Sequence, residues 1–130
     1  MAPGTIIPEL AYPDVREAAA WLCRAFGFRE RLRIGSHRAQ LCFGGASIVA
    51  VEFAGDAASA GGSVMVRVDD VDAHHAKAKA GGARILSAPA DQRYGERQYT
   101  AEDLGGHRWT FSQSIADVDP ADWGGTLLGA

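Results

Sequence analysis

The stretch Pro13-Asp14-Val15 places a helix N-cap directly after a candidate strand, and the same pattern recurs as Asp69-Asp70-Val71. Aspartate is favoured at such positions because its carboxylate accepts hydrogen bonds from the free N–H groups of the first helical turn. The first helix is predicted over about 15–26, with apolar residues at three- and four-residue spacing, and Gly27 ends it. The second is predicted over 71–80 and is followed by a glycine pair. The two N-caps divide the chain into similar halves.

Short strand candidates surround both helices in the same order. Apolar and polar residues alternate within them, and turn residues separate them. The candidates are residues 5–12, 28–34, 38–43 and 47–53 in the first half, and 63–68, 83–87, 97–102 and 108–113 in the second. We therefore predict an α+β fold of two βαβββ modules, 5–53 and 63–113, in one domain over 1–115. Residues 116–130 form a C-terminal tail, in which Asp119-Pro120 is expected to open a short helical turn.

Two modules of this size each leave apolar sheet surface uncovered. Pairing them buries that surface, and the curved mixed sheets would then enclose a cavity. The modules can pair within one chain or be exchanged between two chains. We expect a homodimer because open sheet edges and a concave apolar face need a partner.

Composition narrows the class of protein. The 130 residues are 47% hydrophobic and 22% charged, which suits one compact domain. The net charge of -3 and the lack of a basic run argue against nucleic acid as a partner. No signal-like or membrane-length apolar segment is present, so we expect a cytoplasmic protein without a membrane partner. Cys23 and Cys42 form no C-x-x-C pair and are expected to be reduced, buried and inert.

Several stretches resemble the vicinal oxygen chelate superfamily of glyoxalases, bleomycin resistance proteins and extradiol dioxygenases. The resemblance covers about residues 5–115. Its most specific part is Asp103-Leu104-Gly105-Gly106-His107-Arg108-Trp109-Thr110-Phe111, which is similar to the family ending D-P-x-G-x-x-[WI]-E-F. Further marks are Asp14-Val15 with Ala25-Phe26-Gly27-Phe28, Val68-Asp69-Asp70-Val71-Asp72 with Gly82-Ala83, and Tyr94-Gly95-Glu96-Arg97. The chain departs from the pattern at Leu104, where Pro is usual, and at Thr110, where metal-dependent members place Glu.

The resemblance implies, for the enzymes of the family, a divalent ion held by side chains of the first and fourth strands of each module. Aligning the aspartates and the glycine pairs places Ile7, Val49, Ser63 and Thr110 at these positions. A Lewis-acidic ion needs His, Gln or Glu there. We therefore predict a branch without metal and without another cofactor.

The histidines offer no substitute ligand set. His74 and His75 are adjacent on a helix, so their side chains point about 100° apart, and we expect both on a solvated face. His37 and His107 are expected in turns, because neither has a second ligand at metal-binding spacing.

Period-two alternation divides the strand residues between two faces. The helix-covered face is predicted to carry Leu10, Tyr12, Val64, Val66, Val68, Trp109 and Phe111. The cavity wall is predicted to carry Ile7, Glu9, Val49, Val51, Phe53, Ser63, Met65, Arg67, Thr110 and Ser112, and its mouth Tyr94, Arg97 and Tyr99. An apolar wall with a few polar groups suits a ligand pocket.

The charged members of this set have a second interpretation each. Glu9 is either a cavity carboxylate or a structural ion-pair partner. Arg67 either contacts ligand, or forms a salt bridge to Glu9 or a dimer contact, since an arginine at a strand centre needs a partner. Arg97 either contacts ligand or pairs with an acid of its own chain.

Three functions remain open. The missing metal ligands favour a non-catalytic protein, similar to the bleomycin-resistance branch, that sequesters an aromatic or peptide-like natural product or antibiotic. The alternative is a glyoxalase-like lyase or isomerase, or a dioxygenase-type enzyme, acting on a small oxygenated substrate through Glu9, Arg67 or a metal site placed elsewhere. The third is a structural or regulatory dimer with an incidental cavity. No residue is assigned a catalytic role.

Overall fold

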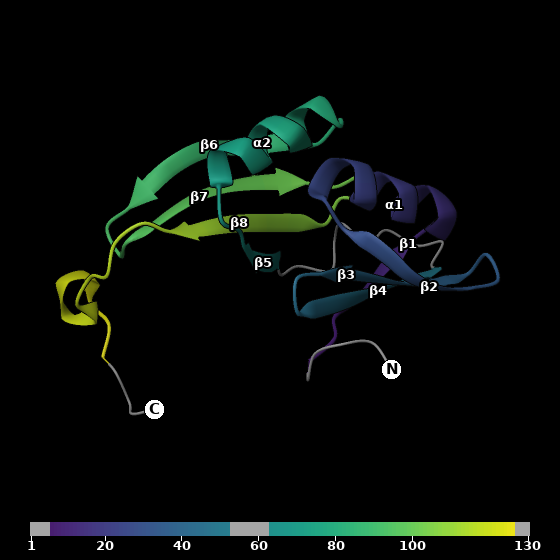
Figure 1. The fold of residues 1–130 in the computed structure, drawn as a ribbon, viewed down its shortest axis with the longest axis horizontal. Coiled ribbons are helices and arrows are strands. Elements are labelled where there is room, and N and C mark those ends of the chain that lie inside the picture. Colours follow the sequence, from purple (N-terminus) through teal and green to yellow (C-terminus); the bar gives the residue numbers. More distant parts are fainter. Residues whose placement is uncertain (1–5, 53–62, 127–130) are drawn as a thin grey trace.

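A computed structural model describes residues 6–52 and 63–126 (Figure 1). Phe53 and Thr5, which the expected strands include, lie outside the described residues. The first module contains β1 (Glu9–Tyr12), α1 (Val15–Trp21), η1 (Leu22–Phe26), β2 (Arg29–Ile34), β3 (Arg38–Phe43) and β4 (Ala46–Glu52). The second contains β5 (Ser63–Arg67), α2 (Val71–Ala80), β6 (Arg84–Gln92), β7 (Glu96–Glu102) and β8 (Arg108–Ser114). The predicted α+β fold of two βαβββ modules is confirmed.

Each module forms its own four-stranded sheet. The strand orders are β1-β4-β3-β2 and β5-β8-β7-β6. The β1–β4 and β5–β8 pairs are parallel, and the other pairs are antiparallel. Both helices lie on the same side of the two sheets (Figure 1). We call the other side of each sheet its open face.

Both predicted N-caps are present. The Asp14 side chain accepts a hydrogen bond from the Glu17 N–H at 3.1 Å, and Asp70 accepts one from the Ala73 N–H at 3.1 Å. The first helix ends at Gly27, whose φ of 83° suits glycine. Its second half, η1, is a π-helical turn, which the apolar spacing did not predict.

Aromatic side chains from both modules form one continuous core. Phe26, at the end of η1, packs against Trp109 and Phe111 of β8, with ring centroids 5.3 and 4.9 Å apart. Trp109, Phe111 and Tyr12 are fully buried. The predicted helix-covered face is therefore correct for these residues, and burial of their large side chains stabilises the contact between modules.

Asp103 links the modules through a buried hydrogen-bond network. Its carboxylate accepts from the Tyr12 hydroxyl at 2.7 Å and from the Trp109 indole N–H at 3.0 Å. The other oxygen accepts from the backbone N–H groups of Gly105 and His107 at 2.9 and 3.0 Å, which closes the β7–β8 turn. His107 lies in this turn, as expected. The most family-specific part of the sequence thus has a structural role.

Most strands agree with the predicted bounds to within one residue, and two differ by more. β1 begins at Glu9 instead of residue 5, and β6 extends to Gln92. β6 contains Pro89 and two register shifts. It is an edge strand, and a proline without an N–H group is tolerated there.

The C-terminal tail contains the expected helical turn, η3 (Pro120–Trp123), and Asp119 caps it by accepting from the Ala121 N–H at 3.0 Å. Trp123 packs against Tyr94, with ring centroids 5.7 Å apart. Both cysteines are free, Cys42 buried and Cys23 half-buried. No helix within residues 6–52 and 63–126 is long and apolar enough to cross a membrane.

Candidate functional site

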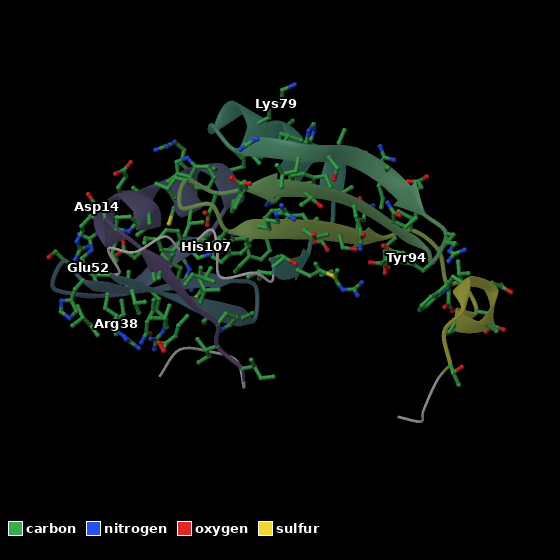
Figure 2. The ribbon with its side chains drawn as sticks, turned by 180° about the vertical axis from the view of Figure 1, so that it is seen from behind. Asp14, Arg38, Glu52, Lys79, Tyr94 and His107 are labelled. Atoms are coloured by element: carbon green, nitrogen blue, oxygen red, sulfur yellow. The ribbon has the colours of Figure 1, made fainter. Side chains whose placement is uncertain are left out.

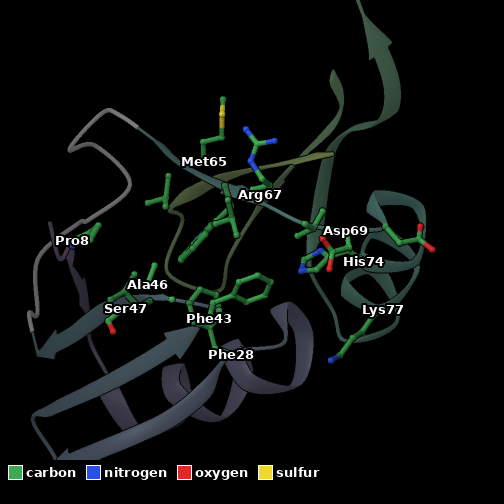
Figure 3. A pocket seen from close by; sticks show the side chains of 18 of the residues that line it. Pro8, Phe28, Phe43, Ala46, Ser47, Met65, Arg67, Asp69, His74 and Lys77 are labelled. Carbon is green, nitrogen blue, oxygen red and sulfur yellow. The ribbon is translucent and has the colours of Figure 1, made fainter. Parts of the chain in front are cut away.

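A cavity of about 850 Å³ lies between the two modules, beside β5 and the first turns of α2 (Figure 3). We call it the intermodule cavity. Its apolar lining includes Phe28, Phe43, Ile48, Val64, Met65 and Trp109. Its polar lining comprises Ser47, Arg67, Asp69, Asp70, His74 and Lys77. Its size and mainly apolar walls are those of a small-molecule site.

Three aromatic rings form one wall of the cavity. The Phe28 ring lies 5.3 Å from that of Phe43 and 5.5 Å from that of Trp109, measured between centroids. Phe28 and Trp109 also belong to the core, which holds the wall in place. Such a wall contacts flat or apolar ligand groups favourably. Phe28 and Phe43 were not among the predicted wall residues, although both flank the turns that end the first helix and β3.

His74 lies at the cavity and joins the two modules. Its Nε2 is 2.9 Å from the Phe26 carbonyl oxygen, and its Nδ1 is 2.6 Å from the Tyr99 hydroxyl. A carbonyl oxygen only accepts, so Nε2 carries the proton and Nδ1 accepts from Tyr99 in the neutral ring. Burial lowers the pKa of His74, and the hydrogen bond to Phe26 opposes this only in part. The neutral imidazole is therefore the favoured form.

The expected solvated position of His74 is wrong. The helix has few large apolar residues of its own, and His74 falls three residues after buried Val71 and four before buried Ala78. That spacing places it on the buried face. His75 is also half-buried, with its ring edge against Tyr99 at 5.1 Å.

Arg67 lies at the cavity but does not pair with Glu9. It donates to the Ser114 hydroxyl at 2.8 Å and lies 4.0 Å from the Glu96 carboxylate. Hydrogen bonds from Ser114 and Ser112 lower the pKa of Glu96. The Arg67 side chain remains 71% exposed, so its guanidinium is accessible to a ligand. The alternative interpretation of Arg67 as the salt-bridge partner of Glu9 is not supported, since Arg67 lies beside Glu96 and Ser114.

Glu9 lies on the open face of the first sheet, where its carboxylate is 3.7 Å from Arg38. Figure 2 shows Arg38 on the side of this sheet away from Asp14 and its helix. Glu9 is outside the lining of the intermodule cavity. Its alternative interpretation, a structural ion-pair partner, is the one that the structure supports.

The three expected mouth residues are not at this cavity. Tyr99 is fully buried on the helix-covered face, because its register opposite Phe111 gives both side chains the same direction. Arg97 pairs with Asp72 at 3.1 Å and Asp91 at 2.9 Å, both acids of its own chain.

Tyr94 is the third expected mouth residue. It donates to the Gln98 side chain at 2.7 Å and lies beside the C-terminal turn (Figure 2). None of Tyr94, Arg97 and Tyr99 belongs to the lining of the intermodule cavity.

The predicted wall residues fall into two groups. Met65 and Arg67 line the intermodule cavity. Outside its lining lie Glu9, Val49, Val51, Ser63, Thr110 and Ser112, which occupy the open faces of the sheets, and Ile7, which precedes β1. Phe53 is outside the described residues. One chain therefore does not bring the whole predicted set together.

The positions that hold metal in related enzymes do not fit a metal here. Ile7 and Val49 offer only hydrocarbon, and Ser63 and Thr110 offer only hydroxyl groups, which are weak donors for a Lewis-acidic ion. Within residues 6–52 and 63–126, no three His, Cys, Asp or Glu side chains are grouped closely enough to hold an ion.

Family comparison agrees with the two-module architecture. The sequence-family model of the Glyoxalase/Bleomycin resistance protein/Dioxygenase superfamily matches residues 6–111 of this chain. The chain belongs to this superfamily.

Solved structures share the fold. TioX from Micromonospora sp. ML1 is 38% identical, with a TM-score of 0.74 over 86% of this chain and 99% of that one. The bleomycin resistance determinant encoded on the transposon Tn5 is 21% identical, with a TM-score of 0.71 over 87% and 99%. The fosfomycin resistance protein FosX from Listeria monocytogenes is 19% identical, with a TM-score of 0.69 over 87% and 94%. The last two show similarity of fold alone.

Curated relatives are uncharacterized proteins of Mycobacterium bovis and Mycobacterium tuberculosis. Each is 31% identical over 80 residues, or 62% of this chain. The match spans 49% of the M. bovis protein and 44% of the M. tuberculosis protein, so the chain spans about half the length of these relatives.

Proposed function

We propose that the protein is a metal-independent small-molecule binding protein that sequesters an aromatic or peptide-like natural product in the intermodule cavity. The observation that carries this proposal is a cavity of about 850 Å³ with an aromatic wall and few polar groups, in a superfamily member whose four metal positions hold Ile, Val, Ser and Thr. Burial of apolar ligand surface would supply most of the affinity, and the few polar groups would orient the ligand.

Two proteins of similar fold are antibiotic resistance proteins, one for bleomycin and one for fosfomycin. Their identity to this chain is too low to transfer a ligand. They support the idea that a protein of this architecture can provide resistance to an antibiotic. For this chain we propose a natural product with antibiotic activity as the ligand class.

We also propose a cytoplasmic homodimer. No described helix or strand covers the open face of either sheet, and Met65 on the second is 66% exposed (Figure 1). A second copy placed against these faces would bury them. It could also bring Glu9, Val49, Ser63, Thr110 and Ser112, our proposed ligand contacts outside the intermodule cavity, next to a bound molecule.

An enzyme acting on a small oxygenated substrate is the competing proposal. Glu9 has an ion-pair partner in Arg38, and both ring nitrogens of His74 are hydrogen-bonded, so neither is a free general base in this structure. The geometry therefore supports binding better than turnover.

Native mass spectrometry tests the proposed function. The protein is mixed with a panel of aromatic and peptide-like antibiotics, bleomycin among them, and separately with Zn, Ni, Mn and Fe ions. We expect at least one antibiotic to be retained unchanged in mass, without metal. Retention of a stoichiometric metal ion, or conversion of a compound to a product of different mass, would support the enzyme instead. Retention of no compound would contradict the binding function.

A further inference from the structure

The intermodule cavity is lined by four successive residues of β5, from 64 to 67. Side chains of a strand alternate between its two faces, so a cavity against one face would be lined by every second residue. Val64 and Val66 pair with helix-side Trp109 and Phe111, whereas Met65 is on the open face. The cavity therefore lies against the edge of β5, where both sets of side chains and the backbone meet.

Within residues 6–52 and 63–126, no strand pairs with this edge of β5. β5 is the terminal strand of its sheet in the part of the chain that the structure describes. In a parallel pair, alternate residues direct their N–H and C=O groups to the neighbouring strand. The Val68 N–H donates to the Ser112 carbonyl oxygen at 3.0 Å, so Met65 and Arg67 direct their backbone groups away from β8. These groups face the cavity side of β5.

The β3–β4 turn leaves open space on the opposite side of the cavity. Gly44 and Gly45, in the β3–β4 turn, also line the cavity, and a Cβ atom added to either would meet no atom within 4 Å. The aromatic wall of Phe28, Phe43 and Trp109 offers apolar contact in the same space. The cavity thus combines a strand edge with a surface for apolar side chains.

We propose that the ligand binds as an additional strand at the free edge of β5. Its peptide groups would bond to the backbone of Met65 and Arg67, and its apolar groups would contact the aromatic wall. This inference rests on the proposed function and narrows its ligand class to extended, peptide-like molecules with free backbone N–H and C=O groups. Flat aromatic compounds without amides would bind by burial alone.

Three probes separate strand addition from simple burial. The first is a blocked pentapeptide of alternating valine and phenylalanine with a terminal lysine for solubility, the second is the same peptide methylated at every backbone nitrogen, and the third is anilinonaphthalene sulfonate. We expect methylation to weaken binding at least about ten-fold, since it removes more than one hydrogen bond of the edge. Equal affinities of the two peptides, or binding of the naphthalene dye without the peptide, would overturn strand addition while leaving a binding cavity. Binding of none of these probes, and of no antibiotic, would overturn both proposals.

Amide hydrogen exchange locates the peptide. Saturating peptide is expected to slow exchange at Met65 and Arg67 and to leave Val64 and Val66, which already face β8, nearly unchanged. Protection at all four amides or at none would overturn the proposal. A third outcome would also overturn the proposal: without peptide, protection of Met65 and Arg67 increases with protein concentration. This result would mean that a second copy of the chain occupies the edge of β5.

A pair of variants at Met65 tests whether the backbone N–H group of this residue binds the peptide. Met65→Pro removes an N–H group on the free side of β5 without removing a bond to β8, and prolines are tolerated at such positions. Met65→Ala removes the side chain but keeps the N–H group. We expect the proline variant to bind the pentapeptide at least about ten-fold more weakly than the alanine variant. Equal affinity would contradict strand addition, and if Met65→Pro does not fold, the exchange pattern of the unmodified protein decides.

Discussion

Tyr12 and Asp103 are ninety-one positions apart in the chain, yet they form one of its most buried polar contacts. Burial, together with the charge of Asp103, raises the pKa of the Tyr12 hydroxyl, so this group remains a donor throughout the physiological range. The carboxylate also accepts the Trp109 indole N–H. Because both partners of Asp103 are buried, loss of either leaves part of a buried charge without a hydrogen bond.

We expect Tyr12→Phe to lower the free energy of unfolding by about 1 to 3 kcal/mol, because the buried Asp103 carboxylate loses a donor. Denaturant titration measures this change. Tyr94→Phe is the control, since it also removes one hydroxyl, but from a half-buried bond to Gln98. If the two substitutions lower the free energy of unfolding equally, the buried bond to Asp103 contributes no more to stability than the half-buried bond to Gln98.

His74 predicts a dependence of stability on pH. Its pKa in the folded protein is lowered from 6.5, chiefly by burial. Below about pH 6.5 the unfolded chain therefore takes up a proton that the folded chain resists, and the free energy of unfolding falls as the pH falls towards the folded pKa. Well above pH 6.5 both states are neutral at this site, so the pH has no further effect on stability through His74.

His74→Gln tests this expectation, because a glutamine can donate to the Phe26 carbonyl and accept from Tyr99 without titrating. We expect the variant to lose less stability than the unmodified protein between pH 7 and about pH 5. Urea titrations across this range measure the two slopes. The other histidines are the same in both proteins, so parallel slopes would contradict the assignment to His74.

At the scale of elements, capping hydrogen bonds from nearby residues determine where the two helices begin. Asp14 and Asp70 each accept a hydrogen bond from the residue three positions later. The caps act on residues nearby in the chain, which explains why the sequence alone predicted both helix starts correctly.

Asp14→Ala is expected to reduce the free energy of unfolding by about 1 kcal/mol through loss of the cap of α1, and Asp14→Ser to restore most of it. Thermal and urea denaturation compare the three proteins. Asp14 is remote from the intermodule cavity lining, so ligand affinity should not change. A serine variant as unstable as the alanine variant would show that the aspartate acts through something other than capping.

For the strands, the sequence predicts the directions of side chains but not the position of a free edge. The alternation within β5 and β8 correctly predicted which side chains face the helix, but it contained no information on which edge of a strand stays free. That edge is the one that borders the cavity. Tyr99 illustrates the same limit, since its direction follows from its register opposite Phe111, and this register is a contact between two strands.

At the scale of the whole molecule, two helices cover one side of the sheets, and no other described helix or strand covers the opposite side (Figure 1). The second sheet places Met65, Thr110 and Ser112 on this open side. An uncovered sheet face with an exposed methionine suits association with a second copy. The proposed dimer would therefore form through the open faces.

Analytical ultracentrifugation at micromolar concentration tests the dimer. We expect the unmodified protein to sediment as a dimer. Thr110→Lys places a charge at the centre of an open face, and we expect it to raise the dissociation constant of the dimer at least about ten-fold. Ala76→Lys, on the exposed side of α2, is the control and should have no effect. A stable monomer of the unmodified protein would contradict the proposal.

Local chemistry in the sequence determined the order of elements, the helix starts, the duplication into two βαβββ modules and the side-chain types at the family's metal positions. These features depend on caps, turns and alternation within a few residues. Only the tertiary structure decided that His74 bridges the modules, that Arg67 lies near Glu96 and not Glu9, and that the cavity borders the edge of β5. These features depend on how the two modules pack and in which register their strands pair, and such long-range contacts leave no periodic signal in one sequence.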